Sequence, residues 1–273
     1  MYIPLMARVE SLPPLPQSVL ELEKLFTSEY PEINELVDVI SRDPSLTADI
    51  LSKVNAPFYG FTQQINSLTQ ALTLFGSSQI RAMILASSIQ KCFEVDLSPY
   101  GITTTEFSKI SSMQSELIFQ WYMEIDITLA REITPIAFLM EIGKILIAKD
   151  ILGKEKQEDF LKDLHTYTDI SDVENIYTMM STPEVNALIF KQLNLNKTFT
   201  ETMRYFNDEE SAPKSMKETL FALQTVQKII NIREQFNEET INEVMHTLKE
   251  KSYDVNSLQR VIRRIQNKYM RVD

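Results

Sequence analysis

Apolar side chains recur along this chain every three or four positions, the spacing that places them on one face of an α-helix. One such set consists of Leu46, Ile50, Leu51 and Val54. The alternation of apolar and polar residues that is typical of a half-buried strand is missing, and only 5 of the 273 residues are glycine. The pattern therefore predicts an all-α fold.

Helix start signals divide this pattern into separate elements. A Ser, Thr or Asp side chain accepts hydrogen bonds from the first turn of a helix, and proline suits the first helical position. Capping boxes are expected at Thr103-x-x-Glu106, Ser171-x-x-Glu174 and Ser215-x-x-Glu218, and pairs of a cap and a proline at Thr134-Pro135 and Thr182-Pro183. We expect helices at residues 16–27, 33–42, 44–55, 67–75, 77–93, 104–126, 135–151, 155–166, 171–180, 183–193, 198–207, 215–235, 237–251 and 254–270.

The segment from Asp43 to Pro57 has the clearest local signals. Asp43 is expected to cap the helix that Pro44 begins. Asn55 lies just before Pro57, where the helix must end, so its side-chain amide is placed to bond chain ends on either side.

Composition limits the classes of function. With 44% hydrophobic residues the chain can form a sizeable core, and its one cysteine, Cys92, excludes an internal disulfide. No apolar run approaches the ~20 residues of a membrane span, and the first residues lack the features of a secretory signal. We therefore expect a soluble cytoplasmic protein. The net charge of −11 argues against general attraction to nucleic acid or anionic membranes.

Two stretches with the composition of loops suggest the domain layout. Residues 94–103 combine proline, glycine and a following cap, and residues 207–214 form an acidic loop. We expect one domain over residues 8–206 with helical lobes at about 8–93 and 104–206, and a helical extension over 207–273 packed on it.

Successive motifs in the first third of the chain carry a family resemblance. They are Leu12-Pro13-Pro14-Leu15-Pro16, Asp43-Pro44-x-Leu46-Thr47, Asn55-x-x-Phe58-Tyr59-Gly60 and Ala71-x-x-x-x-Gly76. These motifs resemble those of the HDOD (HD-related output domain) family, bacterial all-helical signalling modules similar in fold to the HD phosphohydrolases. Phe75 departs from the family, which usually has leucine before this glycine. The resemblance implies structural or interaction roles for Pro13, Pro16, Asp43, Pro44, Asn55, Phe58, Tyr59, Gly60 and Gly76.

The same resemblance implies that the metal ligands of the HD enzymes are missing. Residues 137–144 are similar to the family's Gly-Leu-Leu-His-Asp-Ile-Gly-Lys, so Met140 replaces the histidine and Glu141 the aspartate. Residues 203–207 stand where many relatives carry further histidines, and here they carry none. The chain's two histidines, His165 and His246, precede threonines and are expected at the surface. A thioether is a weak ligand for hard divalent ions, so the resemblance implies no metal, no cofactor and no catalytic residue.

Three hypotheses of function follow. The favoured one is a non-enzymatic signal-transduction module that acts through protein contacts, with motility or chemotaxis among the processes the family suggests. The first alternative is a residual metal-dependent phosphohydrolase of (cyclic) nucleotides that uses Glu141, Asp126 or Asp150. The second is a nucleic-acid-binding regulator whose basic C-terminal helix carries Arg260, Arg263, Arg264 and Lys268, although such a charge run more often pairs with the protein's own acids.

The aromatic segment Phe58-Tyr59-Gly60-Phe61 also has two interpretations. Three rings in a short loop between helices are hard to bury completely, so an exposed part could anchor a protein partner. The more ordinary interpretation is packing between the lobes.

Overall fold

The computed structural model describes residues 4–26, 31–93 and 95–270. The very N-terminus, the last residue of the first expected helix (Thr27) and Glu94 of the expected linker lie outside the described residues. The described residues contain helices and no named strand, with one isolated antiparallel bridge between Ile230 and Gln235. The prediction of an all-α fold is confirmed. In the part of the chain described here, no helix is both long and apolar enough to cross a bilayer.

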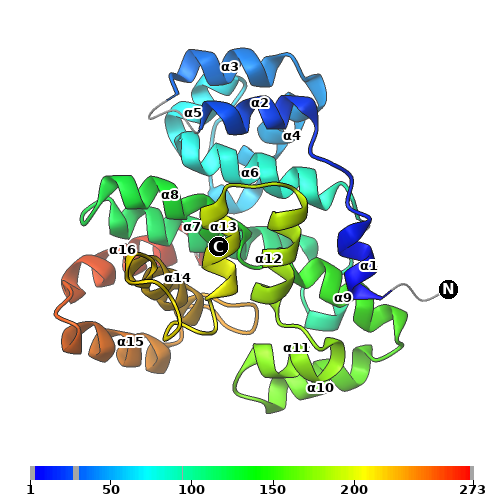
Figure 1. Cartoon of the computed structure of the whole chain (residues 1–273). Helices are drawn as coiled ribbons and strands as arrows, with labels where there is room; N and C mark the ends of the chain where they lie inside the picture. The colour runs from blue at the N-terminus through cyan, green and yellow to red at the C-terminus, as the bar shows by residue number, and fades with distance from the viewer. Residues whose placement is uncertain (1–3, 27–30, 94, 271–273) are drawn as a thin grey trace. The chain divides into compact units, whose positions relative to one another are not determined.

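The first of two compact units comprises residues 1–14, 90–112 and 139–237. Its elements are α1 (Leu5–Glu10), η2 (Ser98–Tyr100), the start of α7 (Thr104–Tyr122), α9 (Lys144–Gly153), α10 (Gln157–Thr166), α11 (Ile170–Thr178), α12 (Thr182–Gln192), α13 (Lys197–Arg204), η3 (Lys214–Met216) and α14 (Lys217–Ile229). Helix α9 lies in the middle, because α1, α10, α11, α12 and η2 all contact it (Figure 1). Most of its side chains are correspondingly apolar, with Ile145, Leu146, Ile147 and Ile151 buried.

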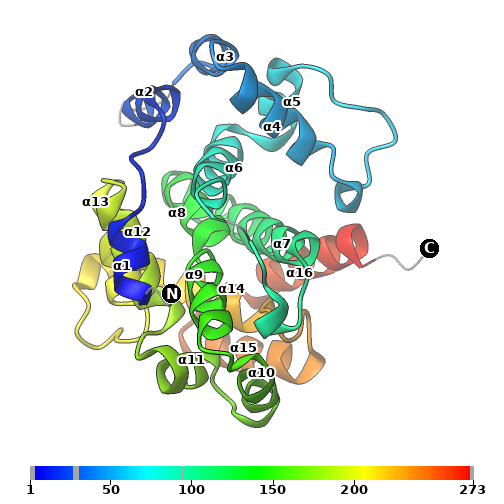
Figure 2. The same ribbon diagram turned by 90° about the vertical axis from the view of Figure 1, so that its right-hand side faces the viewer.

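The second unit comprises residues 15–89, 113–138 and 238–273. Its elements are α2 (Gln17–Leu25), α3 (Ile33–Ser41), α4 (Pro44–Val54), η1 (Pro57–Tyr59), α5 (Leu68–Phe75), α6 (Ser77–Gln90), the end of α7, α8 (Ile127–Leu139), α15 (Glu238–Glu250) and α16 (Val255–Tyr269). Helices α2 to α5 form one group, and α7 runs alongside α16 (Figure 2). The two units are interleaved along the chain. The expected lobes over 8–93 and 104–206 and the expected extension over 207–273 stay a prediction.

Several local signals act as expected. The Asp43 carboxylate accepts a hydrogen bond from the Leu46 amide at 3.0 Å, and Pro44 begins α4. The Asn55 amide donates to the carbonyls of Leu51 and Ile65 and accepts from the Ile65 amide, so it joins both ends of the following loop. The Thr103–Glu106 capping box forms at the start of α7.

Two of the expected capping boxes do not form. Helix α11 is capped by Asp169, and Glu174 points instead into a buried cluster described below. Helix α14 follows the 3-10 turn η3 and has Met216, without a side-chain cap, in place of the expected Ser215 box.

The expected start at Thr134-Pro135 is also wrong, because α8 begins eight residues earlier, at Ile127, and contains Pro135. The Thr134 hydroxyl donates to the Ala130 carbonyl at 2.6 Å, a bond within the helix. The long helix expected over 135–151 is therefore two helices, α8 and α9, separated by residues 140–143. One of those four residues, Glu141, belongs to the candidate site.

Candidate functional site

Three buried charged side chains meet beside the turn between α8 and α9. The Lys144 ammonium lies 2.9 Å from a Glu141 carboxylate oxygen and 3.0 Å from a Glu174 oxygen. None of these side chains exposes more than 3% of its surface. We call these residues, with the polar groups that bond them, the charge cluster; its members are Tyr100, Glu141, Lys144, Glu174, Thr182 and Gln227.

Neutral donors complete the bonding of the two carboxylates. Glu174 accepts from the Tyr100 hydroxyl at 2.9 Å and from both the amide and the hydroxyl of Thr182, at 2.5 and 2.7 Å. Glu141 accepts from the Gln227 side-chain amide at 3.1 Å. Because a buried charge is tolerated only when it is paired and hydrogen-bonded, these contacts explain how three charges remain inside the unit.

Helix α9 and three elements that contact it supply four of the six members of the charge cluster. Lys144 is the first residue of α9, Glu174 lies on α11, Thr182 begins α12 and Tyr100 ends η2. The Thr182 amide is free to donate to Glu174 because it belongs to the first turn of α12, where helices have no internal acceptor. The expected cap at this helix lies one residue earlier, since Ser181 forms the capping box with Glu184.

The electrostatics fix the protonation states of Lys144 and Tyr100. Burial lowers the pKa of Lys144, but the Glu141 and Glu174 carboxylates outweigh burial, and the pKa rises above its ordinary 10.5. Burial, reinforced by the Glu174 charge, raises the pKa of Tyr100 well above 10.0. At neutral pH the lysine is therefore an ammonium ion and the tyrosine a neutral donor.

A second buried contact links Met140 to Met203, the first residue of the segment 203–207 that was compared with the histidine region of relatives. The Asn186 side-chain amide donates to the Met140 carbonyl at 2.6 Å and lies 3.5 Å from the Met203 sulfur. Its oxygen accepts from the Gly143 amide at 2.7 Å. A Cβ added at Gly143 would lie 2.8 Å from the Asn186 oxygen and 2.9 Å from the Thr182 carbonyl, so this turn requires glycine for close approach.

The remaining candidate ligands are dispersed. His165 contacts the Leu161 carbonyl and His246 contacts Glu250, and both are exposed. Asp150 pairs with Lys154 at 2.8 Å, whereas Asp126 accepts from the amides of the first turn of α8. Burial raises the pKa of the Cys92 thiol. Among the described residues, no three His, Cys, Asp or Glu side chains are grouped so that they could hold a metal ion.

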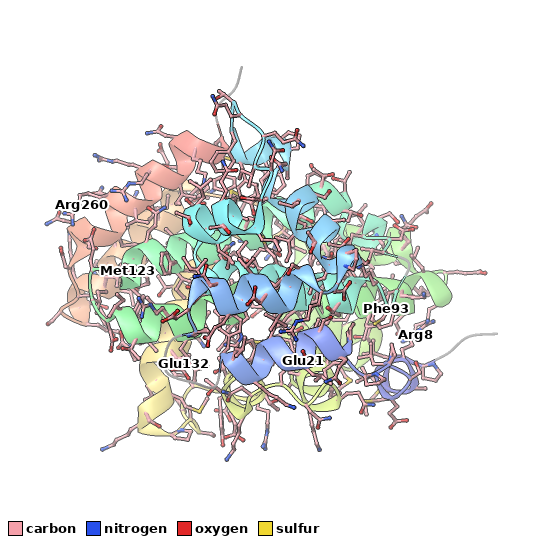
Figure 3. All side chains as sticks on the ribbon, turned by 90° about the horizontal axis from the view of Figure 1, so that it is seen from above. Arg8, Glu21, Phe93, Met123, Glu132 and Arg260 are labelled. Carbon is pink, nitrogen blue, oxygen red and sulfur yellow. The ribbon has the colours of Figure 1, made fainter. Side chains whose placement is uncertain are left out.

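The basic C-terminal helix α16 pairs with acidic and amide groups on α7. Arg260 and Ser257 donate to Glu124, Arg264 to Gln120, and Lys268 and Tyr269 to Glu116. Arg260 lies on the outer side of α16, and Met123 lies in the turn after α7 (Figure 3). Of the four cations considered for nucleic acid, Arg263 alone is exposed without a partner in the described part of the chain.

Most of the family-motif residues belong to the second unit, whereas Pro13 belongs to the first. Pro13 and Pro16 precede α2 in a stretch without helix, and the Ser18 hydroxyl donates to Asp43. Tyr59 is buried against Phe75 and Tyr269. Gly60 and Gly76 have φ angles of +69° and +78°, which explains glycine at both positions. The four rings of Phe58, Tyr59, Phe61 and Phe75 thus gather within one unit.

Sequence reasoning missed Lys144, Glu174 and Asn186. Glu174 was assigned to a local capping box, although its partner lies 30 residues away. A usable signal was present at Lys144, which is followed by Ile145-Leu146-Ile147-Ala148. A lysine at the start of an apolar helix needs a buried counter-ion, and Glu141 stands three residues before it.

Comparison with known proteins gives one family match. A family model described as HDOD domain matches residues 12–209. The uncharacterized protein YuxH of Bacillus subtilis (strain 168) is 33% identical over 101 residues, which cover 37% of this chain. The match covers 24% of YuxH, about a quarter of its length.

Solved structures resemble nearly the whole chain. A virulence factor from Campylobacter jejuni subsp. jejuni is 26% identical, with a TM-score of 0.60 over 98% of this chain and 97% of that one. A protein from Shewanella amazonensis SB2B described as a candidate phosphohydrolase is 17% identical, with a TM-score of 0.72 over 97% and 95% of the two chains. At that identity the second likeness is one of fold.

Proposed function

Because this chain belongs to the HDOD family, we propose that it is a non-enzymatic regulatory module of signal transduction that acts through protein contacts. The observation that supports this proposal is the charge cluster. At the position that aligns with the catalytic His-Asp pair of the HD enzymes, Glu141 is bound to a buried lysine instead of facing a solvent-filled site.

Hydrolysis of a phosphate ester by an HD-type mechanism needs a divalent ion and a water molecule that the ion activates. Several oxygen or nitrogen ligands must hold that ion. Here the two nearest carboxylates share the Lys144 ammonium, which already neutralises one of their charges. Met140 offers a thioether in place of imidazole and is itself buried. The chemistry of these groups fits a fixed internal ion pair better than it fits metal-dependent hydrolysis.

A regulatory module must instead offer surfaces to other proteins. The partner, and the suggestion that the process is motility or chemotaxis, rest on the family resemblance, and fold analogy alone is a weak warrant for function. The similarity to a bacterial virulence factor over 98% of this chain is consistent with a regulatory role in a bacterium.

An activity assay tests the proposal. The purified protein is incubated with cyclic dinucleotides and with nucleoside triphosphates in the presence of Mn²⁺ or Mg²⁺, and products are separated by chromatography. We expect no turnover above that of buffer. Turnover that Glu141→Ala abolishes would refute the proposal; the matched control is Glu155→Ala, which removes an exposed carboxylate just after α9.

A further inference from the structure

One surface of the second unit is built from a stretch of chain without charge. From Val54 to Ile80, between Lys53 and Arg81, 27 consecutive residues include no Asp, Glu, Lys, Arg or His. In a chain with 24% charged residues, the next longest run of this kind, residues 11–20, has ten. This run forms η1, the loop after it, α5 and the start of α6.

Twelve residues of this run are exposed, and we call them the neutral face. They are Pro57, Gly60, Phe61, Thr62, Gln63, Gln64, Asn66, Ser67, Thr69, Gln70, Thr73 and Leu74. Phe61 exposes 43% of its surface and Leu74 52%, so two large apolar side chains stand among amides and hydroxyls. Depletion of charged residues is the feature that the neutral face shares with the centre of a protein interface.

The neutral face is held in a fixed shape. Asn55 joins the two ends of the loop through three hydrogen bonds, to Leu51 and Ile65. Inside the loop, the Phe61 ring lies 5.7 Å from Phe75, which itself packs edge-on against the buried Tyr59 at 4.8 Å. A surface that is ordered before binding loses less conformational entropy when it binds.

We propose that the neutral face is a self-association surface, which joins two copies of this chain about a two-fold axis. In such a contact each residue meets the same surface on the other copy, so a charged residue near the axis would meet its own charge. Asn, Gln, Ser and Thr side chains carry both a donor and an acceptor and can therefore bond to their own copies. The side chains of Thr62, Gln63 and Gln64 have no hydrogen-bond partner among the described residues and are available for this.

The net charge of the chain favours the neutral face over acidic surfaces for contact between two copies. Two chains of net charge −11 repel each other, and a contact that brought acidic groups together would add to this repulsion. The neutral face avoids that juxtaposition, because it adds no charge of its own. Dimerisation through it should therefore depend weakly on salt, unlike a contact made by opposite charges. This inference is independent of the regulatory proposal, since an enzyme could dimerise in the same way.

Sedimentation velocity of the full chain between about 1 and about 100 μM tests the inference, because that range brackets the dissociation constants of modest interfaces. The wild type is compared with Phe61→Glu, which alters the loop, and with Leu74→Glu, which alters α5. The matched control is Ile125→Glu, an equally exposed apolar residue in the turn after α7. The turn contains Glu124, which pairs with Ser257 at the start of α16, whereas Phe58 of the aromatic loop contacts Tyr269 at the end of α16. The control substitution and the neutral face therefore lie near opposite ends of that helix.

We expect the wild type and Ile125→Glu to form dimers alike, in both dilute and concentrated NaCl. Each glutamate on the neutral face should weaken the dimer at least about tenfold, because it places like charges opposite each other. Circular dichroism verifies that the variants are folded. A wild type that stays monomeric, a dimer that salt dissociates, or a dimer that survives both Phe61→Glu and Leu74→Glu would overturn the inference. If the wild type stays monomeric, the neutral face would instead be a contact surface for a different protein.

Discussion

Lysine and glutamate pair in both units, but in different surroundings. In the first unit Lys144 bridges Glu141 and Glu174 with at most 3% of any of these side chains exposed. In the second unit Lys268 of α16 pairs with Glu116 of α7, and these side chains expose 32% and 20% of their surface. The chemical groups and their distances are nearly the same, 2.9 Å in one case and 2.8 Å in the other.

The two ion pairs differ in whether water can replace a charged partner that is lost. At the surface, water replaces a missing counter-ion, so an ion pair there contributes little to stability. In the interior nothing replaces it, and the remaining charge is left in a medium that solvates it poorly. The charge cluster is therefore a feature that the first unit cannot lose, whereas the contacts of α16 orient a helix that is also held by its buried apolar side.

The largest effect is expected from Lys144→Met, which leaves two carboxylates buried without a cation. We expect the free energy of unfolding in urea to fall by about 3–5 kcal/mol. Lys156→Met is the matched control, because Lys156 and Asp159 form a pair three residues apart that is exposed on both sides. A loss that is equally small for both variants would remove the distinction between the two regions.

A double variant separates loss of charge balance from loss of packing. Glu141→Gln combined with Lys144→Met restores the native net charge of the cluster, so the double variant should be more stable than Lys144→Met alone.

The raised pKa of Lys144 keeps its stabilising contribution complete below pH 10.5, and that contribution is lost only as the pH rises through the folded-state pKa. The contribution of Lys144 to the stability of the wild type should accordingly be constant across neutral pH.

Tyr100→Phe should have the next largest effect. It removes the hydroxyl that donates to Glu174 at 2.9 Å inside the unit. Hydrogen bonds to charged groups contribute about 1.5–3 kcal/mol, and we expect a loss near the lower figure because Lys144 and Thr182 still bond Glu174. Thermal and urea unfolding measure it, and an unchanged stability would show that the bond is dispensable.

Gly143→Ala tests the packing that holds the turn beside the cluster. The added methyl group would meet the Asn186 oxygen at 2.8 Å and the Thr182 backbone at 2.9 Å, so the turn must shift. Overpacking of this kind costs about 1–3 kcal/mol. The control is Gly153→Ala at the exposed end of α9, where alanine should stabilise the helix slightly. Equal stability of the two variants would contradict the close approach.

The smallest effect is expected from Lys268→Met in the second unit. The pair with Glu116 is partly exposed, so its loss should change the free energy of unfolding by about 0.2–1 kcal/mol. Raising the NaCl concentration should reduce even this difference, because salt screens exposed charges. A loss as large as that of Lys144→Met would show that burial does not separate the two pairs.

Local signals in the sequence predicted much of the helical fold. Asp43 bonds a residue three positions away and Asn55 bonds residues four and ten positions away, and both were predicted correctly. The charge cluster was missed because its partners are far apart in the sequence and meet only after α11 packs on α9. The spacing of Ser171 and Glu174 even suggested a different role, since a local cap and a buried ion pair use the same residue types.

The metal content of the purified protein tests the central claim most directly. Wild type and Glu141→Ala, expressed in medium supplemented with Mn²⁺, Fe²⁺ and Zn²⁺, are analysed for bound ions after removal of free metal. Because Lys144 already occupies the space between the two carboxylates, we predict far less than one transition ion per chain in both samples. One or more ions per wild-type chain, lost in Glu141→Ala, would contradict the account.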